Sequence, residues 1–74
     1  METKTFTAVL EREGDTYVAL CPELDVVSQG KSVEEAQANL REAVELFLET
    51  ASELEVKERL HTEIYITRFE VNGG

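Results

Sequence analysis

Apolar and polar side chains alternate along the start of the chain. Phe6, Ala8 and Leu10 fall on one side of an extended backbone, and Thr5, Thr7 and Val9 fall on the other. A period of two is typical of a β-strand, so residues 4–11 are predicted to form one. The turn sequence Glu13-Gly14-Asp15 then leads to predicted strands at residues 17–21 and 26–29. Pro22 ends the second strand, because proline has no N–H to donate to a ladder.

The next segment changes to a helical period. Ser32-Val33-Glu34-Glu35 matches the S-x-x-E capping box, in which the serine hydroxyl and the glutamate satisfy exposed amides. An apolar stripe follows and predicts a helix from Val33 to about Ala51; its members are Val33, Ala36, Leu40, Ala43, Val44, Phe47, Leu48 and Ala51. Residues 52–60 are compatible with a helix extension, a short second helix or a loop. Residues 62–71 predict a last strand, because they are rich in β-branched and aromatic side chains.

These elements give an α+β fold in the order β-β-β-α-β, with one helix covering one face of a four-stranded sheet. The side under the helix is expected to hold Phe6, Ala8, Leu10, Val18, Leu20, Ile64 and Ile66. The opposite side would then expose Val9, Tyr17, Ala19, Tyr65, Phe69 and Val71, an unusually apolar set for a wet surface. We therefore expect a homo-oligomer interface formed by Val9, Tyr17, Tyr65, Phe69 and Val71. The alternative is that residues 52–60 cover this face.

The chain is short enough for residues 1–74 to form a single domain with a thin core, since 42% of its residues are hydrophobic. The single cysteine, Cys21, excludes an internal disulfide, and with one histidine it cannot build a structural zinc site. Self-association is the remaining aid to stability. No signal peptide and no membrane span are expected, so a cytoplasmic location is predicted.

Charge narrows the class of partner. The net charge is −9, and no Lys/Arg cluster suited to a phosphate backbone is present, so direct nucleic-acid binding is not expected. An acidic surface attracts basic partners. The simpler interpretation is that the charge keeps a small protein soluble.

The sequence offers little for catalysis. It contains none of the common nucleotide-binding, zinc-protease or redox motifs. His61 could form an acid/base pair with Glu63, but an exposed loop histidine is the simpler interpretation. Cys21 lies near Glu23 and Asp25, which disfavour a thiolate. We predict no catalytic residue, no cofactor and no metal site.

The segment from Tyr17 to Leu48 resembles the HicB family of bacterial and archaeal antitoxins. The matching features are Pro22-Glu23-Leu24, Val27-Ser28-Gln29-Gly30, and a helix carrying Ser32, Glu35-Ala36, Asn39 and Ala43 in the family's order and spacing. The resemblance implies a partial RNase H-like fold with strand order 3-2-1-4 that is not itself a nuclease. It also implies a partner, a small basic HicA-type toxin that cleaves mRNA, whose active surface the antitoxin covers.

Two departures from the family pattern stand out. The chain stops at Gly74, where full-length relatives continue into a DNA-binding domain, and residues 22–26 lack the Pro-Gly of the common P-x-L-P-G-C loop. The residues expected to contact a partner are Glu23, Asp25, Glu34, Glu42 and Glu45. Two alternatives remain open: a solitary oligomeric structural or regulatory protein without a toxin, and a degenerate RNase H-like nuclease.

Overall fold

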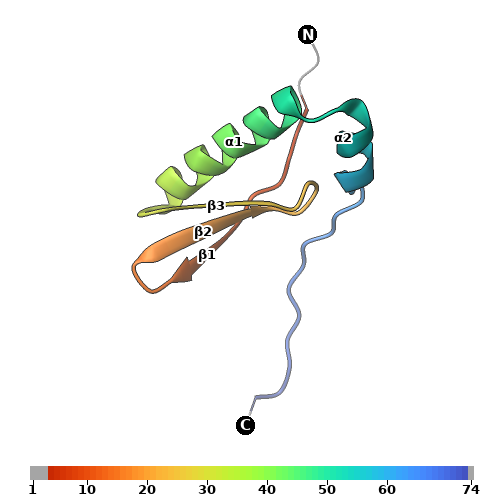
Figure 1. Ribbon diagram of the computed structural model, residues 1–74. Helices are drawn as coiled ribbons and strands as arrows, with labels where there is room; N and C mark the ends of the chain where they lie inside the picture. Colours follow the sequence, from red (N-terminus) through yellow and green to blue (C-terminus); the bar gives the residue numbers. More distant parts are fainter. Residues whose placement is uncertain (1–3, 74) are drawn as a thin grey trace.

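A three-stranded sheet with the long helix packed on one side forms the body of the protein (Figure 1). The computed structural model describes residues 4–73. The elements are β1 (Val9–Glu13), β2 (Thr16–Cys21), β3 (Val26–Gly30), α1 (Val33–Thr50) and α2 (Glu53–Arg59). Both strand pairs are antiparallel, in the order β1-β2-β3. The α+β class, the three successive strands and the long helix are therefore as predicted, but the first strand begins at Val9 and not at residue 4. Within the described residues, neither helix is long and apolar enough to cross a membrane.

The two turns of the meander use different chemistry. Gly14 joins β1 to β2 with a φ of 62°, a value at which glycine has no steric cost. The loop from Pro22 to Asp25 joins β2 to β3, and Asp25 takes a left-handed φ of 55°. Aspartate is among the few residues that tolerate this region. Leu24 of the same loop is fully buried, so the loop belongs to the core.

The side of β2 that faces α1 differs from the prediction. Ala19 and Cys21 are fully buried and Tyr17 packs against the same cluster, so these residues lie under the helix. Strand alternation then places Val18 and Leu20 on the opposite face, and their predicted place under the helix was wrong. Phe6, Ala8 and Leu10 do pack on the helix side, as expected. The assignment of Tyr17 and Ala19 to the uncovered face was likewise wrong.

Close approach of α1 to the sheet explains why the smaller residues face the helix. A Cβ atom built on Gly30 would lie 2.5 Å from the backbone nitrogen of Ala36, far inside normal contact distance. The neighbouring buried positions Ala19, Cys21 and Ala36 are also small. Larger side chains on this side would hold the helix away from β3 and leave voids.

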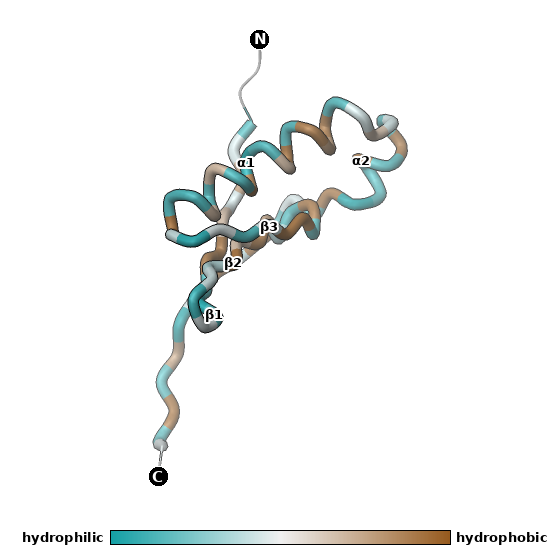
Figure 2. Tube along the Cα trace, turned by 60° about the vertical axis from the view of Figure 1, so that its left-hand side comes forward, coloured by the Kyte–Doolittle hydropathy of each residue, from teal (hydrophilic) through white to brown (hydrophobic). Residues whose placement is uncertain are grey.

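The uncovered sheet face carries an apolar row. Val9, Leu20 and Val27 lie directly opposite one another on the three strands. Val9 and Val27 are 37% and 59% exposed, so no element described here covers this side completely. Polarity increases toward the β1–β2 turn, where Glu11 and Gln29 flank Val18. The hydropathy view in Figure 2 shows brown apolar segments in the strands and along the helix.

Serine caps begin both helices. The Ser32 hydroxyl accepts a hydrogen bond from the Glu35 amide at 3.0 Å, which confirms the predicted cap. The Glu35 carboxylate accepts from the Lys31 amide at 2.9 Å, one residue before the partner that a standard capping box uses. Ser52 and Glu55 form a complete capping box, so residues 52–60 contain a short second helix.

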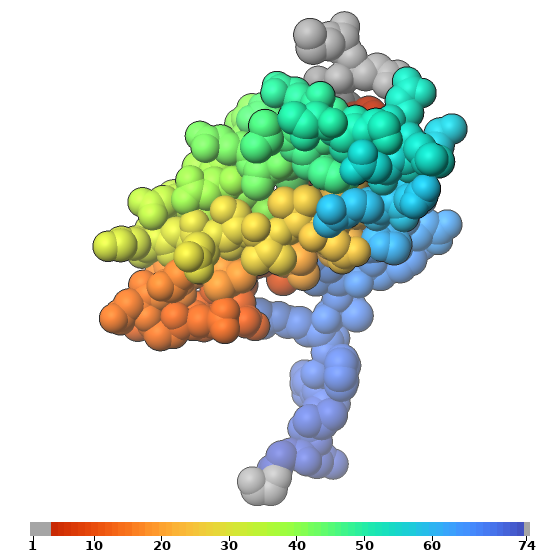
Figure 3. Space-filling view, viewed as in Figure 1, coloured from red at the N-terminus to blue at the C-terminus, as the bar shows by residue number. Residues whose placement is uncertain are grey.

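Residues 60–73 form neither helix nor strand, so the predicted fourth strand is not among the elements of the described chain. We call residues 62–73 the C-terminal extension. It leaves the end of α2 and projects from the body as a single extended segment, as Figures 1 and 3 show. Its side chains are exposed apart from half-buried Ile64, with Tyr65 at 83%, Phe69 at 84% and Val71 at 76%. Ile64 and Ile66 are therefore not packed under α1 as predicted.

The contact between Gly30 and α1 predicts a large effect from one added methyl group. Gly30→Ala places a Cβ against helix backbone that cannot rotate away, and should lower the free energy of unfolding by about 1–3 kcal/mol. Urea denaturation followed by circular dichroism measures this loss. Gly73→Ala is the matched control, because nothing lies within 4 Å of its added Cβ. Equal midpoints for the two variants would contradict the close packing.

Candidate functional site

An acidic ridge runs along the side of α1 that faces away from the sheet. The helix contains five glutamates and one arginine. At 3.6 residues per turn, four of these glutamates fall within an arc of about 80°. The buried stripe of Ala36, Leu40 and Val44 lies on the opposite side. We define the acidic ridge as Glu34, Glu42, Glu45 and Glu49, all exposed.

The acidic ridge holds three of the five residues predicted to contact a partner. Glu34, Glu42 and Glu45 come together because their spacing repeats the helical period. Glu49 completes the ridge and was missed, although its spacing of four from Glu45 is visible in the sequence. Among residues 4–73, no ridge carboxylate forms an ion pair with a lysine or arginine side chain. The four charges therefore act together on the surrounding solvent and on any approaching cation.

The other two predicted contacts, Glu23 and Asp25, lie in the loop between β2 and β3, apart from the ridge. Glu23 is engaged within its own chain. Its carboxylate accepts the Thr7 amide at 3.1 and 3.0 Å and the Thr7 hydroxyl at 2.6 Å. These bonds tie the segment before β1 to the loop after β2. The side chain thus has a structural role in this chain.

Hydrogen bonding dominates the electrostatics of this loop. Partial burial of Glu23 acts to raise the pKa of its carboxyl, but the donors from Thr7 stabilise the carboxylate and bring the pKa below its ordinary value. Cys21 lies next to it, with its thiol 3.5 Å from a Glu23 oxygen. Burial is the main cause that raises the pKa of the Cys21 thiol, and the neighbouring carboxylate adds to it. Cys21 is therefore held as a neutral, buried thiol, which is unsuited to nucleophilic attack.

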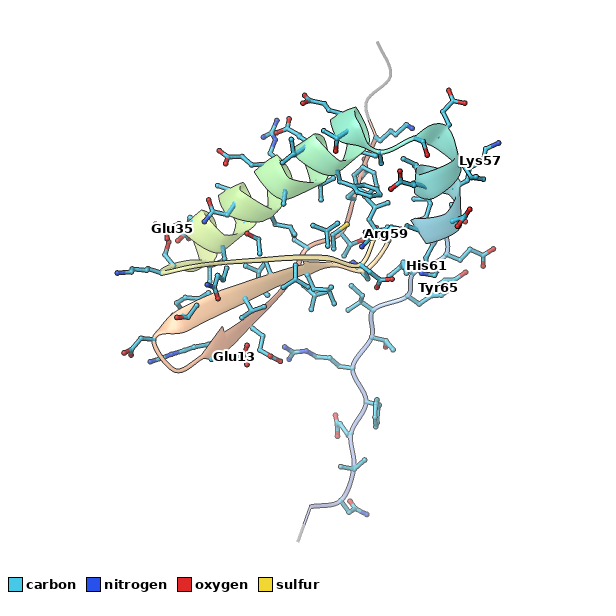
Figure 4. The ribbon with its side chains drawn as sticks, viewed as in Figure 1. Glu13, Glu35, Lys57, Arg59, His61 and Tyr65 are labelled. Atoms are coloured by element: carbon cyan, nitrogen blue, oxygen red, sulfur yellow. The ribbon has the colours of Figure 1, made fainter. Side chains whose placement is uncertain are left out.

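Asp25 is held by Arg59 at the end of α2 and by His61, which are labelled in Figure 4. Arg59 donates to the Asp25 carbonyl at 2.9 Å and places its guanidinium 4.9 Å from the centre of the Phe47 ring. The His61 amide donates to the Glu23 carbonyl at 2.7 Å. The His61 ring nitrogen Nε2 lies 3.4 Å from the Asp25 carboxylate. Polar contacts thus dock α2, which has no buried residue of its own.

The sequence analysis missed these docking contacts. His61 is exposed and lies outside helix and strand, as predicted, but its contacts with the loop were not foreseen, and Arg59 was not singled out. Arg59 and Asp25 are 34 positions apart, and Thr7 and Glu23 are 16 apart, so no local spacing links either pair. Glu63, the suggested partner of His61, instead accepts a hydrogen bond from the Tyr65 hydroxyl at 3.2 Å. Within residues 4–73, no three His, Cys, Asp or Glu side chains converge on one point.

The lowered pKa of Glu23 predicts a pH-dependent contribution to stability. The carboxylate stabilises the fold above its ordinary pKa of 4.5, and this contribution is lost as the pH falls through the lower value of the folded state. Glu23→Gln should therefore lower the free energy of unfolding at pH 7 by about 1.5–3 kcal/mol, the range for hydrogen bonds to charged groups. The difference from the unchanged chain should disappear in strong acid.

Glu45→Gln is the matched control, because it removes the same charge from an exposed position. Denaturation at pH 7 and at successively lower pH measures both variants. A Glu23→Gln variant as stable as the control at pH 7 would contradict the proposed role of the carboxylate.

Comparison with known proteins gives one relevant similarity. Over 42 residues the chain is 52% identical to a UPF0150 protein of Helicobacter pylori strain J99. The match covers 55% of this chain and 58% of the relative, so the chain spans less than two thirds of the relative's length. No protein-family model and no solved structure matches the chain. The chain is thus similar to a UPF0150 protein over about half of its length.

Proposed function

We propose that this chain is a HicB-like antitoxin component, which neutralises a small basic HicA-type toxin by binding over its mRNA-cleaving surface. UPF0150 is a HicB-like family, so the 52% identity over 42 residues supports this assignment. The acidic ridge is the structural observation that carries the proposal. It offers four carboxylates on one helix face, none of which has a structural partner among the described lysines and arginines.

Electrostatics gives the ridge its role in this proposal. A ribonuclease surface must be positively charged to hold the phosphates of its substrate. A row of carboxylates competes for the same surface and accelerates encounter with it. Because the ridge lies opposite the buried stripe of α1, a partner can bind it without disturbing the core. The exposed carboxylate of Asp25 adds a further negative group at the loop.

We further propose that residues 62–71 form the fourth strand of the sheet, beside β1, to give the order 3-2-1-4 of a partial RNase H-like fold. The edge of β1 away from β2 has no neighbouring strand among the described residues. The segment alternates apolar side chains on both faces, which suits a strand buried on two sides. The alternative function, a solitary oligomer without a toxin, is supported by the same observation, because an exposed apolar segment favours self-association.

Charge reversal on the ridge tests the proposed function. Glu42→Lys combined with Glu45→Lys changes the net charge by +4, from −9 to −5. Binding to a co-purified HicA-type toxin should weaken about tenfold or more, equivalent to at least 1.4 kcal/mol. Its dependence on salt concentration should also become shallower, because fewer charges cross the interface. Titration calorimetry at several salt concentrations measures both effects.

Glu53→Lys combined with Glu58→Lys is the control. It gives the same net charge from exposed positions on α2, outside the ridge. Equal losses of affinity for the two double variants would assign the effect to overall charge and remove the ridge from the interface. Unchanged affinity and salt dependence in both would reject electrostatic recognition of the toxin by this chain.

A further inference from the structure

A groove lies between α1 and residues 4–8, the segment that leads into the unpaired edge strand β1. The helix packs mainly on β3 and β2 and only lightly on β1, so it is displaced from the middle of the sheet. The displacement leaves a space of about 570 Å³ beside the segment that leads into β1. Its apolar lining comes from Phe6, Ala8, Leu40, Val44 and Leu48, and the charged side chains that also line it are Lys4, Arg41, Glu45 and Glu49. A strand added to the edge of β1 would lie along this space.

The C-terminal extension has the properties of such a strand. Residues 62–71 span about 33 Å at about 3.3 Å per residue, enough to follow the whole of β1 and the segment before it. Ile64 and Ile66 point to one side of an extended backbone, and Tyr65, Phe69 and Val71 point to the other. Four of these five side chains are more than 60% exposed, with Ile66 at 61%. Exposed segments that are apolar on both faces are unusual in monomers and mark interaction sites.

The two faces of the extension match the two sides of β1. With Ile64 and Ile66 in the groove, the opposite set lies beside Val9, in line with the apolar row of Val9, Leu20 and Val27. The charged residues Arg68 and Glu70 follow on the same side as the two isoleucines, and would lie beyond the groove, toward the β1–β2 turn. The change from apolar to charged side chains therefore occurs where the groove ends.

We propose that the strand in this groove is donated by a second copy of the chain, so that two copies exchange residues 62–71. This proposal rests on the fourth strand of the proposed function and names its donor. In a single chain the extension projects away from the body of the protein (Figures 1 and 2). The His61 amide and the Arg59 guanidinium fix the start of the extension on the loop from Pro22 to Asp25. To pair with β1 of its own chain, the extension would have to reverse direction directly after His61.

Reciprocal exchange pairs the free edge of β1 in both copies. Each copy has one such edge and one unpaired extension, so a two-fold arrangement fills both grooves, while the outer edge of β3 stays on the far side of the sheet. The gain is large for a chain of this size. Its fully formed core consists of six buried residues, namely Ala19, Cys21, Leu24, Ala36, Leu40 and Val44. Small domains of this kind gain stability from association.

Cross-linking between differently tagged chains distinguishes a donated strand from one supplied in cis. One chain carries Glu11→Cys on the uncovered face of β1, and an affinity-tagged chain carries Thr67→Cys on the same side as Tyr65 and Phe69. The two are unfolded, mixed and refolded together, then treated with a short bismaleimide, since neighbouring strands lie about 4.8 Å apart. We expect a cross-linked product that contains both chains. Glu70→Cys in place of Thr67→Cys is the control, because it points to the opposite side and should give at least tenfold less product.

A chain carrying both Glu11→Cys and Thr67→Cys tests the opposite arrangement. A cross-linked product with the mass of one chain, formed in a yield that tenfold dilution does not change, would show that the strand is supplied in cis. This result would overturn the exchange and leave the proposed fourth strand intact. Absence of any cross-link, within or between chains, would overturn both. Neither outcome bears on toxin binding, which the ridge variants test separately.

Light scattering gives an independent measurement. The unchanged chain should have twice its mass of 8.3 kDa, about 16.6 kDa. Ile66→Lys places a charge in the groove and should shift the population to single chains, whereas Glu70→Lys should leave the dimer unchanged. A single-chain mass for the unchanged protein at micromolar concentration would overturn the exchange.

Discussion

The approach of α1 to β3 is the constraint on which the rest of the structure depends. Because Gly30 has no side chain, the helix backbone reaches the sheet at Ala36 and fixes the start of α1 against the third strand. This contact selects alanine and cysteine for the helix side of β2. It also displaces the helix from β1, so the same contact that builds the core creates the groove at the opposite edge.

The loop from Pro22 to Asp25 makes a second set of contacts that stabilise the fold, at the end of β2 away from the β1–β2 turn. Buried Leu24 anchors it in the core, the Glu23 carboxylate binds the segment before β1, and the Asp25 carbonyl receives the end of α2. Three segments distant in sequence therefore meet at one short connection. The family resemblance had marked this loop as a surface for partners, and the structure adds an internal function for its glutamate.

The sequence predicted the local features of the fold well. Ser32 and the apolar stripe defined α1, because capping and helical period depend only on nearby residues. The prediction of which β2 side chains lie under the helix was wrong. Every residue from Tyr17 to Cys21 is apolar, so the alternation of side chains does not indicate which set faces the helix. The capping box of Ser52 and Glu55 was present in the sequence and would have identified α2. The bond between Thr7 and Glu23 could not be predicted, since it joins residues brought together only by the completed sheet. Within the candidate site, the ridge followed from helical spacing alone, whereas the docking of α2 did not.

The acidic ridge, to which we assign the proposed binding role, lies apart from the residues that hold the fold together. Its carboxylates extend from the helix surface farthest from the packed interior, so replacing them costs little conformational stability. Substitutions on the ridge can therefore accumulate without disrupting the fold. Those that improve the fit to the proposed partner can then be selected. Residues such as Gly30 and Leu24 have no such freedom. A scaffold divided in this way can diversify its specificity while its architecture is preserved.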